Sequence, residues 1–170
     1  MPADPNWARW IFASVADNLK QVATEVNLPV LVEHLDERTK SFMEATDRAE
    51  IRITGPFTQE LSKGCFRILV DANVLLTSRY DGQTKNQYQL LEYAGLFHEA
   101  MDTPIPVWNF GSKLTDYQDG DPSTQLFLGC LTPRPGRNES VRVINFGQID
   151  KIDKIKQTAV DASYVMYLDS

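Results

Sequence analysis

The residues of this chain that could bind a metal or act as acids and bases are scattered along the sequence. Asp116, Asp119 and Asp121 form the densest acidic group, in the segment DYQDGD. A calcium-binding EF-hand loop needs ligands at alternating positions, a glycine at the sixth position and a glutamate at the twelfth, and this segment has no such register. His34 and His98 stand alone, without the spacing of a zinc site. We therefore interpret the acidic segment as a solvated loop and each histidine as a solvated or structurally bonded residue.

The patterns of phosphate-binding and nucleophilic enzymes are also missing from the sequence. Neither GxxxxGKS/T nor GxGxxG occurs, and there is no G-x-S-x-G nucleophile elbow. Cys65 and Cys130 each lie in an apolar stretch, which predicts buried core thiols in a reducing compartment. The sequence thus predicts no catalytic residue, no metal and no cofactor, and we expect a protein that is not an enzyme.

The charge of the chain disfavours nucleic acid as a partner. Its 170 residues include 17 basic and 23 acidic side chains, which give a net charge of −6. Proteins that hold DNA through its phosphates carry the opposite sign. No apolar run is long enough to span a membrane, and the segment MPADPNWARW lacks a basic region followed by an apolar core. We therefore expect neither a membrane anchor nor a secretory leader.

The first elements that must position any functional residue are a helix and a short strand. A length of 170 residues predicts one domain over 1–170, since a chain of this size buries roughly 70% of its surface in a single core. Apolar residues at helical spacing predict a helix from about 5 to 27. Pro29 ends it, and Val30, Leu31 and Val32 form a strand. The charged stretch 36–40 reads as a loop or solvated turn.

A hairpin and a second helix follow. Residues 48–54 and 65–77 alternate apolar and polar side chains, so we expect two antiparallel strands joined by a long, mobile loop that includes 57–63. A second helix of about 17 residues begins near Lys85. Residues 104–110 read as an edge strand because of their prolines.

Three further strands complete the prediction, over 125–131, 140–146 and 159–168. Helices and strands alternate without a βαβ rhythm. We therefore predict an α+β fold, with a mostly antiparallel sheet flanked by the N-terminal helix and the second helix.

The order of these elements, with the segments EIRITGPF, CFRILVDANVLLTS, NQYQLLEYAGLFHEAM and IPVWNFG, resembles the tail terminator, or tail completion, proteins of long-tailed bacteriophages. The resemblance covers most of the chain and is best over 50–111. In that family a helix precedes a β-hairpin with an extended loop, a second helix packs on the sheet, and six copies form a ring. The C-terminal FGQIDKIDKIKQTAVDASYVMYL is similar to a closing strand pair of phage neck proteins.

The resemblance implies a structural virion protein. It would form a homohexameric ring at the head-proximal end of the tail, stop polymerisation of the tail tube protein, and bind the head completion or connector protein. Such a protein assembles in the host cytoplasm and resides in the virion neck, and DNA passes through the ring without specific binding. Ring subunits need complementary surfaces and no reactive group, which agrees with the missing catalytic patterns.

Two sets of candidate residues follow from this hypothesis. Interface positions are expected in the loop after the first long strand and in the edge strand 104–110, because loops carry recognition and edges must be covered or paired. These are Thr58, Gln59, Glu60, Lys63, Trp108 and Phe110. Acidic residues are expected to line the channel as a repulsive wall for DNA, with Glu50, Asp71 and Asp81 as candidates.

Other functions stay open at this point. Another phage neck or head-completion protein would share the architecture and differ in its partner. A small α+β enzyme unrelated to phages would need a concave pocket, and Asp116, Asp119 and Asp121 mark where to look for it. A monomeric binding domain is the third alternative.

Overall fold

The computed structural model describes residues 6–79, 85–109, 127–134, 141–150 and 154–169, and within them it has the predicted α+β fold. The helices are α1 (Trp7–Glu25), α2 (Lys40–Glu44) and α3 (Lys85–Met101). The strands are β1 (Val30–Val32), β2 (Asp47–Ser62), β3 (Cys65–Arg79), β4 (Ile105–Trp108), β5 (Phe127–Pro133), β6 (Val141–Asp150) and β7 (Ile155–Asp169).

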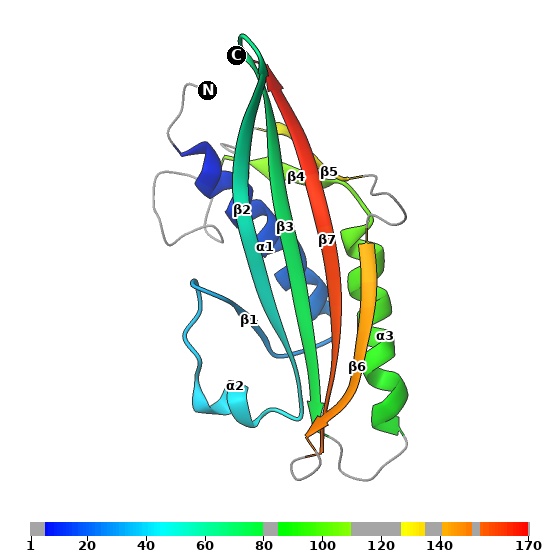
Figure 1. Ribbon diagram of the computed structural model, residues 1–170. Coiled ribbons are helices and arrows are strands. Elements are labelled where there is room, and N and C mark those ends of the chain that lie inside the picture. The colour runs from blue at the N-terminus through cyan, green and yellow to red at the C-terminus, as the bar shows by residue number, and fades with distance from the viewer. Residues whose placement is uncertain (1–5, 80–84, 110–126, 135–140, 151–153, 170) are drawn as a thin grey trace.

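The three long strands β2, β3 and β7 form the centre of one mixed sheet (Figure 1). The strand order is β1-β2-β3-β7-β5-β4, and β6 also pairs with β7. All pairs are antiparallel except β1 with β2. On the side of β7 away from β3, β6 pairs with the first half of the strand, and β5 contacts Tyr164 and Val165 in the second half.

Helices α1 and α3 pack on one face of this sheet, behind the long strands in Figure 1. Their buried residues recur at helical spacing, which is why both helices were predictable: Ile11, Val15, Leu19 and Ala23 in α1, and Leu90, Ala94, Phe97 and Met101 in α3. Helix α1 ends in a Schellman motif, in which the N–H groups of Asn27 and Leu28 bond the carbonyls of Thr24 and Ala23. Asn27 takes the left-handed conformation at φ +53°.

Tyr164 connects the sheet to the end of α3. Its side chain is fully buried, and its hydroxyl donates a hydrogen bond of 3.0 Å to the carbonyl of Met101. Burial, with a smaller contribution from the carboxylate of Asp102, raises the pKa of the Tyr164 phenol far above its ordinary value. The phenol is therefore a neutral donor at physiological pH.

The prediction of a long, mobile loop that includes 57–63 is wrong. Strand β2 runs on to Ser62, and only Lys63 and Gly64 separate it from β3. The predicted strand 48–54 stops before the Gly55-Pro56 pair. In the structure this pair lies in a bulge where the register with β3 shifts. Gly55 adopts φ +107°, which only glycine takes easily, so the strand continues past the bulge.

The charged stretch lies in a loop over 36–39, as predicted, and leads at Lys40 into a short helix, α2, that was not predicted. The hydroxyl of Thr39 accepts a hydrogen bond from the N–H of Phe42 at the start of this helix.

Two smaller expectations need correction. Strand β7 begins at Ile155, not Ala159, because it pairs with the last residues of β3. Cys130 is exposed, since its neighbour Leu131 takes the buried position on β5, whereas Cys65 is half-buried.

Candidate interface surfaces

The predicted loop residues lie at the end of the β2–β3 hairpin. Thr58, Gln59 and Glu60 belong to β2 and Lys63 to the turn, and all four side chains are exposed. Gln59 accepts a hydrogen bond from the guanidinium of Arg67 on β3. Figure 1 shows this end of the hairpin projecting beyond both long helices, beside the C-terminal end of β7. The predicted residues are thus accessible to a partner, although they are held in a strand.

The same end of the molecule exposes large apolar side chains. Phe57 and Leu61 on β2 are 53% and 49% exposed, and Tyr167 on β7 is 60% exposed. Tyr167 lies opposite Arg67 in the β3–β7 register. We call Phe57–Ser62 with Tyr167 the hairpin end.

Trp108 lies on β4, which is the edge strand that the sequence predicted. Its side chain is half-buried and meets Phe127 of β5 edge to face, with ring centroids 5.4 Å apart. Its backbone N–H donates to the hydroxyl of Ser14 on α1 at 3.1 Å. Trp108 therefore packs within its own chain, and a contact with another subunit stays a prediction. Phe110 lies outside the described residues.

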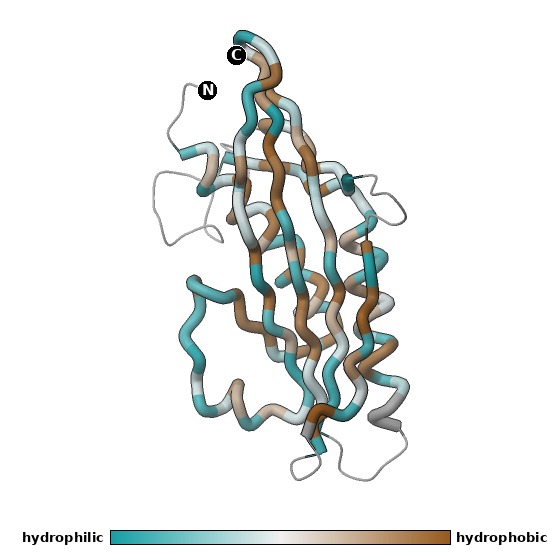
Figure 2. Tube along the Cα trace, in the orientation of Figure 1, coloured by the Kyte–Doolittle hydropathy of each residue, from teal (hydrophilic) through white to brown (hydrophobic). Residues whose placement is uncertain are grey.

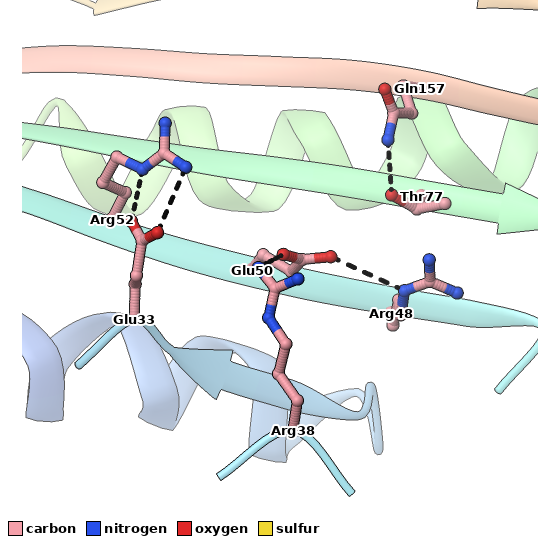
Figure 3. Close-up of polar contacts among 7 residues, drawn as sticks. All are labelled: Glu33, Arg38, Arg48, Glu50, Arg52, Thr77 and Gln157. Carbon is pink, nitrogen blue, oxygen red and sulfur yellow. Dashed lines mark hydrogen bonds and ion pairs between the residues drawn. The ribbon is translucent and has the colours of Figure 1, made fainter. Parts of the chain in front are cut away.

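The candidate channel residues have different surroundings. Glu50 on β2 accepts a hydrogen bond of 3.0 Å from Arg38 and lies 3.7 Å from Nε of Arg48, so two guanidinium groups offset its charge (Figure 3). Asp71 on β3 is exposed and accepts a hydrogen bond of 2.6 Å from Ser163 on β7. Asp81 lies outside the described residues. Of the two described candidates, Asp71 is the one that could present its negative charge.

Polar side chains continue across the sheet face opposite α1 and α3. Arg52 donates to both carboxylate oxygens of Glu33, a bidentate pair seen in Figure 3. The hydrogen bond from Arg52 holds the pKa of the Glu33 carboxyl below its usual value. Asn73 on β3 donates to Asp161 on β7. The Arg52–Glu33 pair joins β2 to the residue that follows β1, and the Asn73–Asp161 hydrogen bond joins β3 to β7.

A small depression lies within this polar region. Its lining includes Glu33, Glu50, Arg52 and Asn73, and its volume is about 40 Å³. This volume holds a few water molecules, whereas sites for organic ligands occupy hundreds of Å³. The depression therefore does not fit an organic substrate. The acidic segment with Asp116, Asp119 and Asp121, which we named as the place to look for an enzyme pocket, lies outside the described residues.

Sequence reasoning missed the surface along β6. Four of its apolar side chains are 37–52% exposed: Val143, Ile144, Phe146 and Ile149. In the described part of the chain, β6 pairs only with β7, so its other edge is open. Figure 2 shows hydrophobic residues recurring along this strand. The available signal was the adjacent apolar pair Val143-Ile144, followed by Phe146, where a half-exposed strand normally alternates apolar and polar residues.

No known family model matches this chain, and no curated protein matches it either. Among the residues that the structure describes, no three histidine, cysteine, aspartate or glutamate side chains gather as metal ligands would. None of the described helices has both the length and the apolar composition needed to cross a membrane.

Proposed function

We propose that this protein is a structural subunit of a ring at the head-proximal end of a bacteriophage tail. The ring stops polymerisation of the tail tube and joins the tail to the head connector. The observation that supports this proposal most strongly is the arrangement of the β2–β3 hairpin. It follows α1, it is followed by α3 on the same face of the sheet, and its end projects beyond both helices (Figure 1). The order of helix, hairpin and second helix is the one that the tail terminator resemblance implies, whereas the extended loop of that family is replaced here by a two-residue turn between two long strands.

Exposed apolar surface gives the proposal physical support. The single chain leaves Phe57 and Tyr167 exposed at the hairpin end, and Phe146 and Ile149 exposed on β6, each by more than half. Several large exposed apolar side chains on one element or at one end of a sheet are typical of surfaces that another protein covers. An assembly subunit has such surfaces at two or more places.

Charge favours a ring that lets DNA pass. Each chain carries −6, so six copies carry about −36. Phosphate binding gains its affinity from cationic side chains that release counterions, and an acidic ring has little of this driving force. Asp71 is the described candidate for the channel wall, because Glu50 is paired with two arginines.

A tube-growth assay tests the proposed function. Tail tube protein of the same phage is polymerised with and without the purified chain, and tube lengths are measured by electron microscopy. The wild-type chain should stop growth, and Leu61→Asp, which places a charge on the hairpin end, should not. The matched control is Leu35→Asp, because Leu35 is 43% exposed and lies away from the hairpin end. Tubes of unchanged length in the presence of the wild-type chain would contradict the proposal.

The same preparation separates the neighbouring role. A head-completion protein would bind the connector of the phage head and leave tube growth unchanged. The partner that is captured, tube or connector, therefore decides between the two neck functions.

A further inference from the structure

The first half of the free edge of β6 has few of the usual protections of an edge strand. Natural sheets protect open edges with lysine, proline, charged side chains, β-bulges, a very short strand, or a covering helix or loop. Residues 141–149 contain neither lysine nor proline, and Arg142 is their one charged residue. The strand has two bulges, after Asn145 and after Gln148, which leave Val141–Asn145 in regular register with β7. A regular, apolar and open edge of this kind is suited to pair with another strand.

Helix α3 lies beside the strand and has exposed apolar side chains of its own. It contacts β6 and runs along it in Figure 1. Its residues Tyr88 and Leu91 are 66% and 45% exposed. We define the β6 surface as these two residues with Val143, Ile144, Phe146 and Ile149.

The β6 surface alone is smaller than a standard interface. Its six side chains, two of them aromatic, are 37–66% exposed and present about 500 Å² in total, divided between two faces because adjacent strand residues such as Val143 and Ile144 point to opposite sides. The largest apolar patch of an ordinary monomer spans about 300–600 Å², and a standard interface buries about 800 Å² on each partner. Backbone and rim atoms of a paired strand would supply the remainder.

The same chain offers a strand that can pair with this edge. Strand β1 covers β2 only at Ala49–Ile51, so in the described residues the outer edge of β2 is open from Arg52 to Ser62. Its regular part, Phe57–Glu60, carries the exposed Phe57 and a single charge, that of Glu60. This charge is opposite to that of Arg142 on β6. The two edges thus match in exposed apolar side chains and complement each other in charge.

We propose that the β6 surface of one copy binds the outer edge of β2 at the hairpin end of a second copy, by addition of one strand to the other. The contact joins two different surfaces, so each copy can bind one neighbour on either side. Contacts of this type produce closed rings when the rotation between copies closes. The inference rests on the proposed function for the closure of the ring, but the contact itself can be tested without a phage.

Two blocked variants test the contact. The first carries Ile144→Lys and Phe146→Lys and loses the β6 surface. The second carries Phe57→Lys and Leu61→Lys and loses the edge of β2. Sedimentation of the full chain should show that each variant alone associates at least about 30-fold more weakly than the wild type, as expected for the loss of central interface residues. An equimolar mixture should form a 1:1 heterodimer, because one intact contact remains.

Controls keep the result interpretable. Met43→Lys, at an exposed position on α2, should associate like the wild type. Circular dichroism checks that each variant is folded, and serine replaces lysine at the same positions if a lysine pair unfolds the chain. The inference is overturned if the β2 variant still dimerises alone, since β6 would then pair with itself. It is also overturned if the mixture stays monomeric, or if the wild type is monomeric up to about 1 mM.

The tube-growth assay and the sedimentation experiment test different claims, so the proposed function and the contact between copies can fail separately. Heterodimers formed by a chain that has no effect on tubes would refute the proposed function and leave the contact standing. Tubes stopped normally by the Ile144→Lys and Phe146→Lys variant, which leaves the hairpin end intact, would refute the contact and leave the proposed function standing.

Discussion

Tyr164→Phe should destabilise the protein at neutral pH by about 1.5 kcal/mol. The substitution keeps the ring and removes the hydroxyl that donates to the carbonyl of Met101. A buried carbonyl left without its donor costs about 1–3 kcal/mol, and the lower half of this range applies because the buried hydroxyl is removed as well. The change therefore measures how firmly the end of α3 is attached to β7.

The difference in stability between the wild type and the Tyr164→Phe variant should depend on pH. Because burial raises the pKa of Tyr164, the folded state binds the phenol proton more tightly than the unfolded chain does. The contribution is fully present below the unfolded pKa of about 10 and is lost as pH rises above it, by about 1.4 kcal/mol per pH unit. At about pH 11 the wild type should have lost about 1.4 kcal/mol of stability from this phenol. The Tyr164→Phe variant loses nothing at this position, because phenylalanine does not titrate. The two proteins should then be nearly equal in stability.

Urea denaturation at neutral pH and at about pH 11 measures both free energies of unfolding. Tyr167→Phe is the matched control, since Tyr167 lies on the same strand and is 60% exposed. It should change stability by less than about 0.5 kcal/mol at neutral pH. If the wild type and the Tyr164→Phe variant differ in free energy of unfolding by the same amount at both pH values, this prediction is wrong, because the hydroxyl would then not be a buried donor.

Three further outcomes are expected. Trp108→Ala should lower the free energy of unfolding of the monomer by about 1–2 kcal/mol in urea, because it removes the edge-to-face contact with Phe127. A shift from oligomer to monomer without loss of stability would instead show that Trp108 acts at an interface. Arg52→Met should cost less than about 1 kcal/mol, as for a partly exposed ion pair. That cost should disappear in acid, as pH falls through the lowered pKa of Glu33. Duplex DNA at low salt should not be shifted in a gel, and micromolar binding would contradict the acidic-channel hypothesis.

Local patterns made much of the fold predictable. The helical spacing of apolar residues identified α1 and α3, and alternation identified the cores of β2 and β3. The continuation of β2 past Gly55-Pro56 was missed because a bulge let the ladder resume, and this depends on the partner strand β3. The exposure of Cys130 was missed for a similar reason, since alternation does not say which face of β5 meets the core.

The interface surfaces were only partly predictable. Thr58, Gln59, Glu60 and Lys63 were selected from the sequence, but as loop residues, and the exposed apolar Phe57, Leu61 and Tyr167 near them were not selected. The open edge of β6 was not selected, because an edge is defined by which strand lies beside it, and β6 and β5 share the same side of β7. Trp108 was selected because it is aromatic and lies near prolines, yet part of its surface is covered by Phe127 of its own chain.

A native mass spectrum of the full chain measures self-assembly itself. It should show a closed oligomer of six 19.3-kDa chains, whose share of the signal rises with protein concentration. A single monomer peak at every concentration, up to about 1 mM, would contradict this prediction.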